Sequence, residues 1–340
     1  MRVFICLLSL GLLSGSLNAA TNGKPVVKAA PVAPKQGVKT PGVQMPFAQI
    51  KAEATLATPE KPAWLYFAAA GPGAIYAPST DKVLKFEAKA NKPAEPIPAV
   101  NKPCGGIVNA FTSMWVASCG DGTLLRLDPR SLKVKATIQA GAAELRGAIA
   151  ASTDSVWIIA DGKQTILRID PDQDAVVGEL RVPPGCSGLT FAETSLWLAC
   201  PEQNKVLRIN PATNLVDKRI DVGAKPLAIA SGQGSIWVLC GKEGKIDRID
   251  PKTDKVAKTI DLLTPDTTGA LTFGEGFLWV TQPGFPLTRI DVADEKVVQQ
   301  FWGEGGGGIL TSAGAIWLSN LNNGTVSRID PKLVLATLVE

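Results

Sequence analysis

Short apolar and alternating runs, separated by turn residues, recur along the chain from residue 63 onward. In one stretch a small apolar run, a β-rich run and two alternating runs follow one another, at 226–230, 235–239, 245–250 and 255–261. Runs of this length with a period of two predict four consecutive β-strands, and the Gly-, Ser-, Pro- and Asp-rich residues between them predict tight turns. No segment shows a sustained helical period, so we expect an all-β fold.

The four-run pattern repeats about every forty residues, and tryptophan marks the period. The marker residues, spaced by 38 to 42 positions, are Trp115, Trp157, Trp197, Trp237, Trp279 and Trp317. A seventh, degraded copy precedes them, with Tyr76 standing 39 residues before Trp115. Residues 63–340 therefore divide into seven units of the length of a four-stranded blade. The sequence predicts a seven-bladed β-propeller of four-stranded antiparallel blades.

Four segments of the repeats match a known pattern: Gly234–Val238 (GSIWV), Arg248–Pro251 (RIDP), Lys255–Ile260 (KVAKTI) and Val222–Pro226 (VGAKP). On these segments the repeats resemble those of the YVTN-type and streptogramin (virginiamycin B) lyase-like β-propellers. The resemblance covers about four-fifths of the chain and implies the propeller fold. It does not imply an activity, because propellers of this type include both enzymes and binding proteins.

Residues that recur in nearly every repeat are expected to be architectural. An arginine follows each tryptophan by ten or eleven residues, and an Asp or Asn follows two positions later, usually before proline. A carboxylate or amide at the first position of a turn can accept hydrogen bonds from the turn amides. We expect the arginine to pair with that carboxylate or with a neighbouring blade, and the tryptophan to pack between blades.

The N-terminal segment predicts export. Arg2 is followed by an apolar run at 3–13 and by a small, polar stretch that ends at Ala20. This order is typical of a secretory signal peptide, assigned to residues 1–20, and the apolar run is too short to span a bilayer. A buried N-terminal helix is the alternative. We expect a secreted or periplasmic protein with no transmembrane segment.

Residues 21–62 differ sharply in composition from the repeats. They contain seven prolines, and six lysines against two acidic residues. Such a segment buries too little apolar surface to offset its ordering entropy, so it predicts a disordered Pro/Lys/Ala-rich linker before a propeller domain at 63–340. The propeller carries 28 basic and 29 acidic residues, which argues against a specific nucleic-acid partner. The linker is interpreted as solubilising, with contacts to anionic surfaces as the alternative.

The five cysteines that follow the predicted signal peptide predict two disulfides and one free thiol. Cys104 and Cys119 flank one hairpin, and Cys186 and Cys200 flank the equivalent hairpin two repeats later. Each pair joins the start of a first strand to the end of a second strand, directly across an antiparallel strand pair. In the oxidising compartment predicted by the signal peptide, such cysteines are expected to form disulfides. Cys240 has no such partner and is expected to be free, either buried or reactive. A zinc site made by the four paired cysteines is the alternative, although the C-x-x-C spacing is missing.

Residues that differ between repeats are the candidates for function. Positions near the start of the first strand and after the second strand are expected to share the axial rim of the ring. The ligand-binding candidates there are Arg146, Lys225, Thr268, Gln282 and Asn320. Glu144, Asp266 and Glu304 stand close by, and their carboxylates could hold Ca²⁺ or Mg²⁺ as in lactonase-like propellers. No other cofactor is predicted.

The chain contains no histidine. Catalytic triads, Cys-His nucleophile systems and haem or copper ligation through imidazole are therefore excluded. Streptogramin-type lyases, which the repeats resemble, are understood to use histidine with a metal. The sequence favours an exported, non-catalytic propeller that binds a protein, peptide or glycan of the cell envelope through its rim. The alternatives are a Ca²⁺- or Mg²⁺-dependent lyase or lactonase-like hydrolase acting in the central funnel, and a structural accessory subunit.

Overall fold

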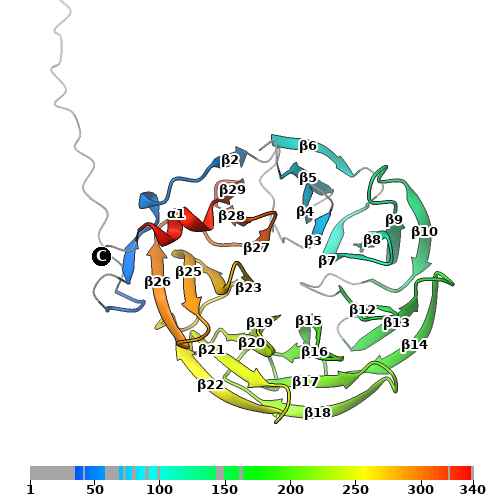
Figure 1. Ribbon diagram of the computed structural model, residues 1–340. Helices are drawn as coiled ribbons and strands as arrows, with labels where there is room; N and C mark the ends of the chain where they lie inside the picture. The colour runs from blue at the N-terminus through cyan, green and yellow to red at the C-terminus, as the bar shows by residue number, and fades with distance from the viewer. Residues whose placement is uncertain are drawn as a thin grey trace, which may run out of the picture. The chain divides into compact units, whose positions relative to one another are not determined.

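The predicted strands form seven sheets that stand as blades around a common axis (Figure 1). The computed structural model describes residues 35–40, 43–57, 69–71, 74–78, 82–88, 92–97, 100–142, 149–160, 164–320 and 322–337. Ala33–Glu340 make up one compact unit. The predicted signal peptide and the first part of the linker, up to residue 34, lie outside the described residues. The seven-bladed, all-β prediction is confirmed.

Each blade is numbered here in chain order, with its strands given from the axis outward. Blade 1 consists of β3 (Ala69–Gly71), β4 (Ala74–Pro78), β5 (Val83–Glu87) and β6 (Lys92–Ile97). Blade 2 consists of β7 (Pro103–Ala110), β8 (Ser113–Ser118), β9 (Thr123–Leu127) and β10 (Val134–Gln139). Blade 3 consists of β11 (Ile149–Ala151), β12 (Val156–Ala160), β13 (Thr165–Asp170) and β14 (Ala175–Arg181). Blades 4 and 5 are β15 (Ser187–Ala192), β16 (Ser195–Cys200), β17 (Lys205–Asn210) and β18 (Leu215–Asp221); and β19 (Pro226–Gly232), β20 (Ser235–Cys240), β21 (Lys245–Asp250) and β22 (Lys255–Asp261).

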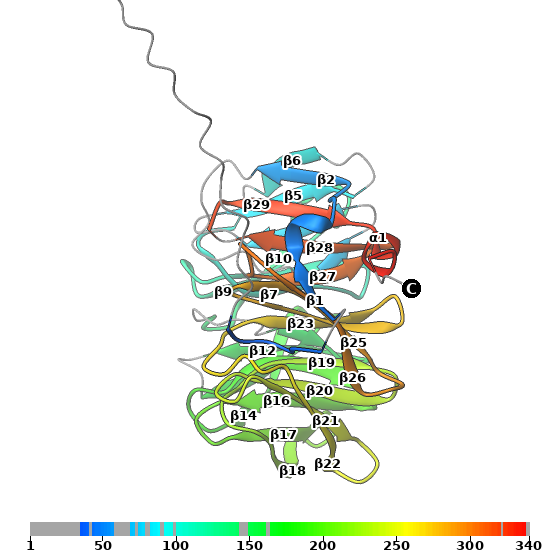
Figure 2. The same ribbon diagram turned by 90° about the vertical axis from the view of Figure 1, so that its left-hand side faces the viewer.

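Blades 6 and 7 each contain a strand that comes from the N-terminal part of the chain. Blade 6 is β23 (Ala270–Gly274), β24 (Phe277–Gln282), β25 (Phe285–Asp291) and β26 (Lys296–Trp302), with β1 (Gln44–Pro46) added in parallel outside β26. Blade 7 is β27 (Ile309–Ser312), β28 (Ala315–Asn320) and β29 (Thr325–Ile329), with β2 (Ala54–Ala57) as its outermost, antiparallel strand. Figure 2 shows β1 and β2 on the outer side of these blades.

This arrangement corrects the linker prediction for residues 43–57. They are ordered because they bury Met45, Ile50 and Leu56 against blades 6 and 7. Hydrogen bonds also fix this segment: the Gln300 amide donates to the Val43 carbonyl at 2.8 Å, and the Glu53 amide donates to the Arg328 carbonyl at 2.9 Å. Just before it, the Val38 amide donates to Gln300 Oε1 at 2.8 Å. We call residues 35–40 and 43–57 the N-terminal strap. Because β2 is part of blade 7, the strap joins the last blade to the chain that leads into the first.

The repeated tryptophan and arginine face each other across two strands in blades 2 to 7, and Tyr76 faces Lys85 at the same position in blade 1. Trp237 on β20, for example, is the cross-strand partner of Arg248 on β21. The six repeat tryptophans are at most 1% exposed, and each indole nitrogen donates a hydrogen bond within its own hairpin. They form the core between blades, as the sequence analysis expected.

The repeated arginine connects one blade to the next. Arg208 donates from Nη1 to the Pro251 carbonyl at 2.9 Å and to Asp254 Oδ1 at 2.8 Å, both in blade 5. Its Nε donates to Ser195 Oγ at 2.9 Å in its own blade, and its guanidinium lies 5.4 Å from the ring centroid of Trp197. Arg126 and Arg248 likewise pair with Asp174 and Glu295 of the following blades.

The repeated Asp or Asn caps its own turn and does not pair with the arginine two positions before it. Asp128 Oδ1 accepts hydrogen bonds from the amides of Arg130 and Ser131 at 3.0 and 2.8 Å. These bonds, those of Ser131 first, lower the pKa of Asp128 to about 2. The cap is local and strong, as expected for a charged acceptor facing turn amides.

In the last repeat the turn is replaced by a short helix, α1 (Pro331–Leu335), with Asp330 as its N-cap. Gln299 Nε2 on β26 donates to the Val334 carbonyl at 2.7 Å, which fastens α1 to blade 6. Among the described residues, no helix is long and apolar enough to cross a membrane.

Candidate functional site: the axial cavity

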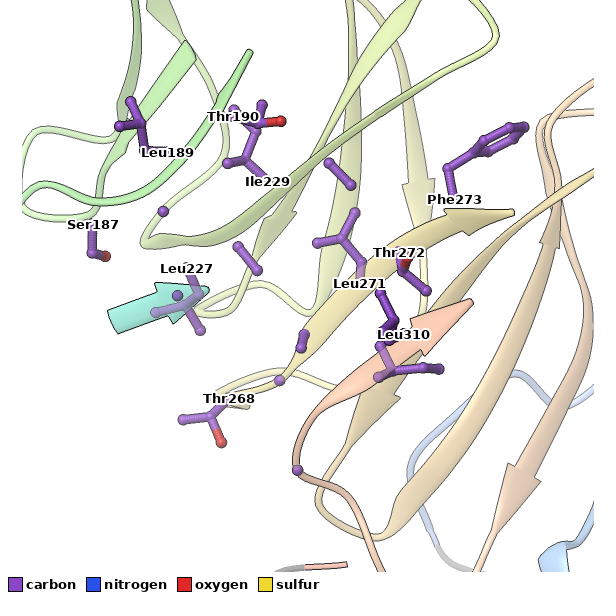
Figure 3. Close-up of a pocket in the computed structure, with 18 of the residues that line it drawn as sticks. Ser187, Leu189, Thr190, Leu227, Ile229, Thr268, Leu271, Thr272, Phe273 and Leu310 are labelled. Atoms are coloured by element: carbon purple, nitrogen blue, oxygen red, sulfur yellow. The ribbon is translucent and has the colours of Figure 1, made fainter. Parts of the chain in front are cut away.

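The innermost strands of the blades surround an axial cavity of about 460 Å³ (Figure 3). Six branched aliphatic residues, one from each of blades 2 to 7, contribute to its wall: Ile107, Ile149, Leu189, Ile229, Leu271 and Ile309. Each of them stands eight residues before the tryptophan of its repeat. Branched side chains fit the pleated inner strand, so the same residue type serves as strand former and as cavity wall.

The polar groups of the described wall are hydroxyls and backbone amides. Ser187, Thr190, Ser231, Thr268 and Thr272 contribute hydroxyls, and none of the described lining residues is ionisable. Each innermost strand pairs within its sheet on one side only, so its other edge leaves backbone N–H and C=O groups without sheet partners. The wall thus combines an apolar surface with neutral hydrogen-bonding groups, which is typical of ligand pockets of this volume.

The two ends of the cavity differ in character. Thr268 is exposed and precedes β23, whereas Phe273 lies near the end of the same strand. A Cβ atom at Gly232 would overlap the ring of Phe273, so glycine in blade 5 allows the aromatic ring of blade 6 to approach. Thr268 therefore marks an open mouth, and Phe273 narrows the opposite end.

Of the rim residues expected from the sequence, Thr268 lines the cavity. The prediction for Gln282 is wrong, because its side chain is fully buried and bonded to the hydroxyl of Thr264, with Nε2 to Oγ1 at 3.0 Å. Its neighbour Pro283 lines the cavity instead. Gln282 is drawn inward because Thr264, itself 2% exposed, offers a buried polar partner between blades 5 and 6.

The other predicted rim residues are not part of the described cavity wall. The Lys225 backbone amide donates to Asn204 Oδ1 at 2.9 Å, and its side chain is exposed. Asn320 Oδ1 accepts from the Asn322 amide at 3.0 Å and so caps its own turn. Arg146 lies outside the described residues.

The three carboxylates considered for a cation are not brought together by the described structure. Asp266 forms an ion pair with Lys242, with Nζ to Oδ1 at 2.6 Å, and Glu304 is exposed. Glu144 lies outside the described residues. Where residues are placed, no group of three or more His, Cys, Asp or Glu could hold a metal ion.

Both predicted disulfides are present, in blades 2 and 4. Cys104 is bonded to Cys119, and Cys186 is bonded to Cys200. Cys240 is a free, fully buried thiol, as the sequence analysis expected. Burial raises the pKa of Cys240 well above its usual range, and the nearby Asp247 carboxylate adds to the shift, with Sγ to Oδ2 at 3.6 Å. Cys240 is therefore a structural thiol and not a reactive one.

Solved structures with the same fold include two lyases. A streptogramin B lyase is 16% identical to this chain, with a TM-score of 0.67, over 81% of this chain and 96% of that one. The virginiamycin B lyase of Staphylococcus aureus is 17% identical, with a TM-score of 0.65, over 81% and 97% of the two chains. A third similar structure is a catalytically inactive variant of that enzyme, with a histidine replaced by alanine, determined with quinupristin.

The WD40 domain of Neurospora crassa Pan2 is equally similar in structure. It is 13% identical, with a TM-score of 0.67, over 83% of this chain and 95% of that domain. No protein-family model and no curated protein matches the sequence. The structural likeness to streptogramin-lyase-like propellers is confirmed, and at these identities it establishes the fold alone.

Proposed function

We propose that the protein is an exported, non-catalytic β-propeller that binds an apolar segment of a protein or peptide partner in its axial cavity. The observation that carries this proposal is the neutral, apolar wall contributed by the innermost strands of six blades. An apolar side chain gains free energy on leaving water for such a wall, and a charged group does not. The free edges of the inner strands supply hydrogen bonds for the backbone of a bound segment.

The chemistry of the described wall supports binding without catalysis. General acid–base and nucleophilic catalysis need an ionisable group within reach of the substrate, and the described lining residues offer none. The S. aureus lyase variant that lost a histidine is catalytically inactive, and this chain has no histidine at all. Similarity of fold to that enzyme therefore does not support the lyase reaction here.

A glycan is the less favoured partner. Sugar rings stack on exposed aromatic side chains, whereas the six repeat tryptophans are buried between blades. The only aromatic side chain on the described wall is Phe273. Export is supported by the two disulfides, which persist in oxidising compartments.

The proposal is tested by titrating the protein with Nile red, an uncharged apolar dye. We expect saturable binding at one site, and we expect Thr268→Trp, which places an indole in the mouth, to weaken it by about tenfold or more. The matched control is Thr213→Trp, at an exposed turn on the outside of blade 4, which should bind the dye as the unmodified protein does. Equal affinity of both variants and the unmodified protein would place the dye elsewhere and refute the cavity.

A further inference from the structure

The two disulfides differ in their access to solvent. Cys186 and Cys200 are 0% exposed. Cys104 and Cys119 are only half-buried, and their neighbours Lys102 and Gly120 are exposed. Thiol–disulfide exchange requires a thiolate to approach a sulfur in line with the S–S bond, so access decides which disulfide reacts.

The half-buried disulfide fastens an irregular part of β7. On β8 one residue lies between Val116 and Ser118. On β7 three residues lie between their partners, Ile107 and Pro103. Residues 104–106 thus form a bulge in the register of β7 with β8. In blades 4 and 5 the corresponding irregularity contains a single extra residue. The longer bulge of blade 2 includes two glycines, Gly105 and Gly106, which restrain the backbone least.

The same bulge forms part of the cavity wall. Gly106 and Ile107 line the axial cavity, directly after Cys104 in the chain. The bond from Cys104 to Cys119, together with the Cys119 amide that donates to the Lys102 carbonyl at 3.2 Å, holds this wall against β8. The covalent bond therefore ties the bulged end of β7, next to the cavity wall, directly to the end of β8.

We propose that the Cys104–Cys119 disulfide is a thiol–disulfide exchange site for dithiols and that its opening loosens the blade 2 wall of the axial cavity. One thiolate of the dithiol attacks a sulfur of the pair, releases the other cysteine as a thiolate and forms a mixed disulfide. The second thiol of the reductant then displaces the remaining cysteine. The reductant supplies two electrons and two protons, leaves as a cyclic or protein disulfide, and two cysteine thiols result.

The exchange chemistry stands on accessibility alone, whereas the effect on ligand binding rests on the proposed function of the cavity. The first test therefore measures reduction directly. Folded protein is exposed to increasing dithiothreitol, alkylated with iodoacetamide and mapped by peptide mass spectrometry. We expect labels on Cys104 and Cys119 at a dithiothreitol concentration about tenfold below that needed for Cys186 and Cys200. Labelling of both pairs together, or of the blade 4 pair first, would overturn the exchange site.

The second test follows the wall. Amide hydrogen exchange should become faster in peptides that cover 103–110 after selective reduction, while peptides that cover 226–232 of blade 5 should be unchanged. Nile red affinity should fall about threefold or more on reduction of the unmodified protein and of Cys240→Ser. The double variant Cys104→Ser/Cys119→Ser should bind Nile red with the lower affinity of the reduced protein, whether or not dithiothreitol is present. Reduction that changes neither the exchange rate at 103–110 nor the affinity would overturn the coupling. If the oxidised protein binds no dye, the proposed function fails, and the exchange rates still decide the inference.

Discussion

Arg208 and its counterparts form a repeated bridge between blades, and Arg289 in blade 6 is the exception. The acidic partner of Arg208, Asp254, stands six residues after the arginine of the next repeat, and the corresponding residue for Arg289 is Val334. The serine that accepts from Arg208 is replaced by Phe277 in blade 6. The guanidinium lies 4.3 Å from the centroid of the Phe277 ring, and Nε has no hydrogen-bond partner among the described residues. Arg289 is 3% exposed, and this burial lowers its pKa.

A matched pair of substitutions tests this difference. Arg208→Met removes a hydrogen-bonded ion pair and leaves Asp254 without its partner, so it should lower the free energy of unfolding by about 2 kcal/mol. Arg289→Met removes a buried charge that no described carboxylate pairs with, so it should be neutral or stabilising. Urea unfolding of both variants gives the comparison. A larger loss for Arg289→Met than for Arg208→Met would contradict the assignment.

The turn cap of Asp128 predicts a pH dependence. Its folded pKa of about 2 lies below the ordinary value of an aspartate, so the cap stabilises the fold fully above about pH 4. This contribution is lost as the pH falls from about 4 to about 2, because the carboxylate becomes protonated. Asp128→Asn should therefore show a shallower decline of the melting temperature over that interval than the unmodified protein. Identical slopes would show that the cap does not depend on charge.

At the scale of elements, the N-terminal strap completes the ring. β2 supplies the outer strand of blade 7 and β1 extends blade 6, so their removal exposes the edges of β29 and β26. An open edge is a template for pairing with another chain. The strap also buries three apolar side chains, Met45, Ile50 and Leu56.

Truncation distinguishes the strap from the residues before it. A chain that starts at residue 58 should lose about 5 kcal/mol of stability, from the burial of three apolar side chains, and should self-associate. A chain that starts at residue 35 should have the same melting temperature and the same association state as the full-length chain. Thermal unfolding and light scattering measure both effects. Equal stability of the two truncated chains would contradict the role given to β1 and β2.

The repeats were predictable because blades 2 to 7 each carry a tryptophan, an arginine and a turn cap at nearly fixed spacing, and Tyr76 keeps the phase in blade 1. The strap was not, because Ala54–Ala57 is short and its pairing with β29 is separated from it by about 270 residues of chain. Composition alone assigned it to the linker. What orders it is the open edge of blade 7, which no local pattern reveals.

At the scale of the whole molecule, the cavity arises from residues that recur, whereas the candidates for function predicted from the sequence are residues that differ between repeats. The aliphatic position eight residues before each tryptophan was available as a signal, for example at Ile229 and Leu271. It was overlooked because repeated residues were assigned to architecture. Here they do both: Leu271 packs in the core between blades and also lines the cavity. The blades of the propeller pack against one another and surround an axial cavity, and the described residues of its wall are uncharged and mostly apolar.

Binding in the axial cavity is tested most directly by selecting peptides from a random displayed library on the purified protein. We expect enrichment of peptides with an uncharged apolar run, which Nile red displaces and which Thr213→Trp retains but Thr268→Trp does not. Enrichment of highly charged peptides, or of peptides that Thr268→Trp binds equally well and Nile red does not displace, would contradict binding in the axial cavity.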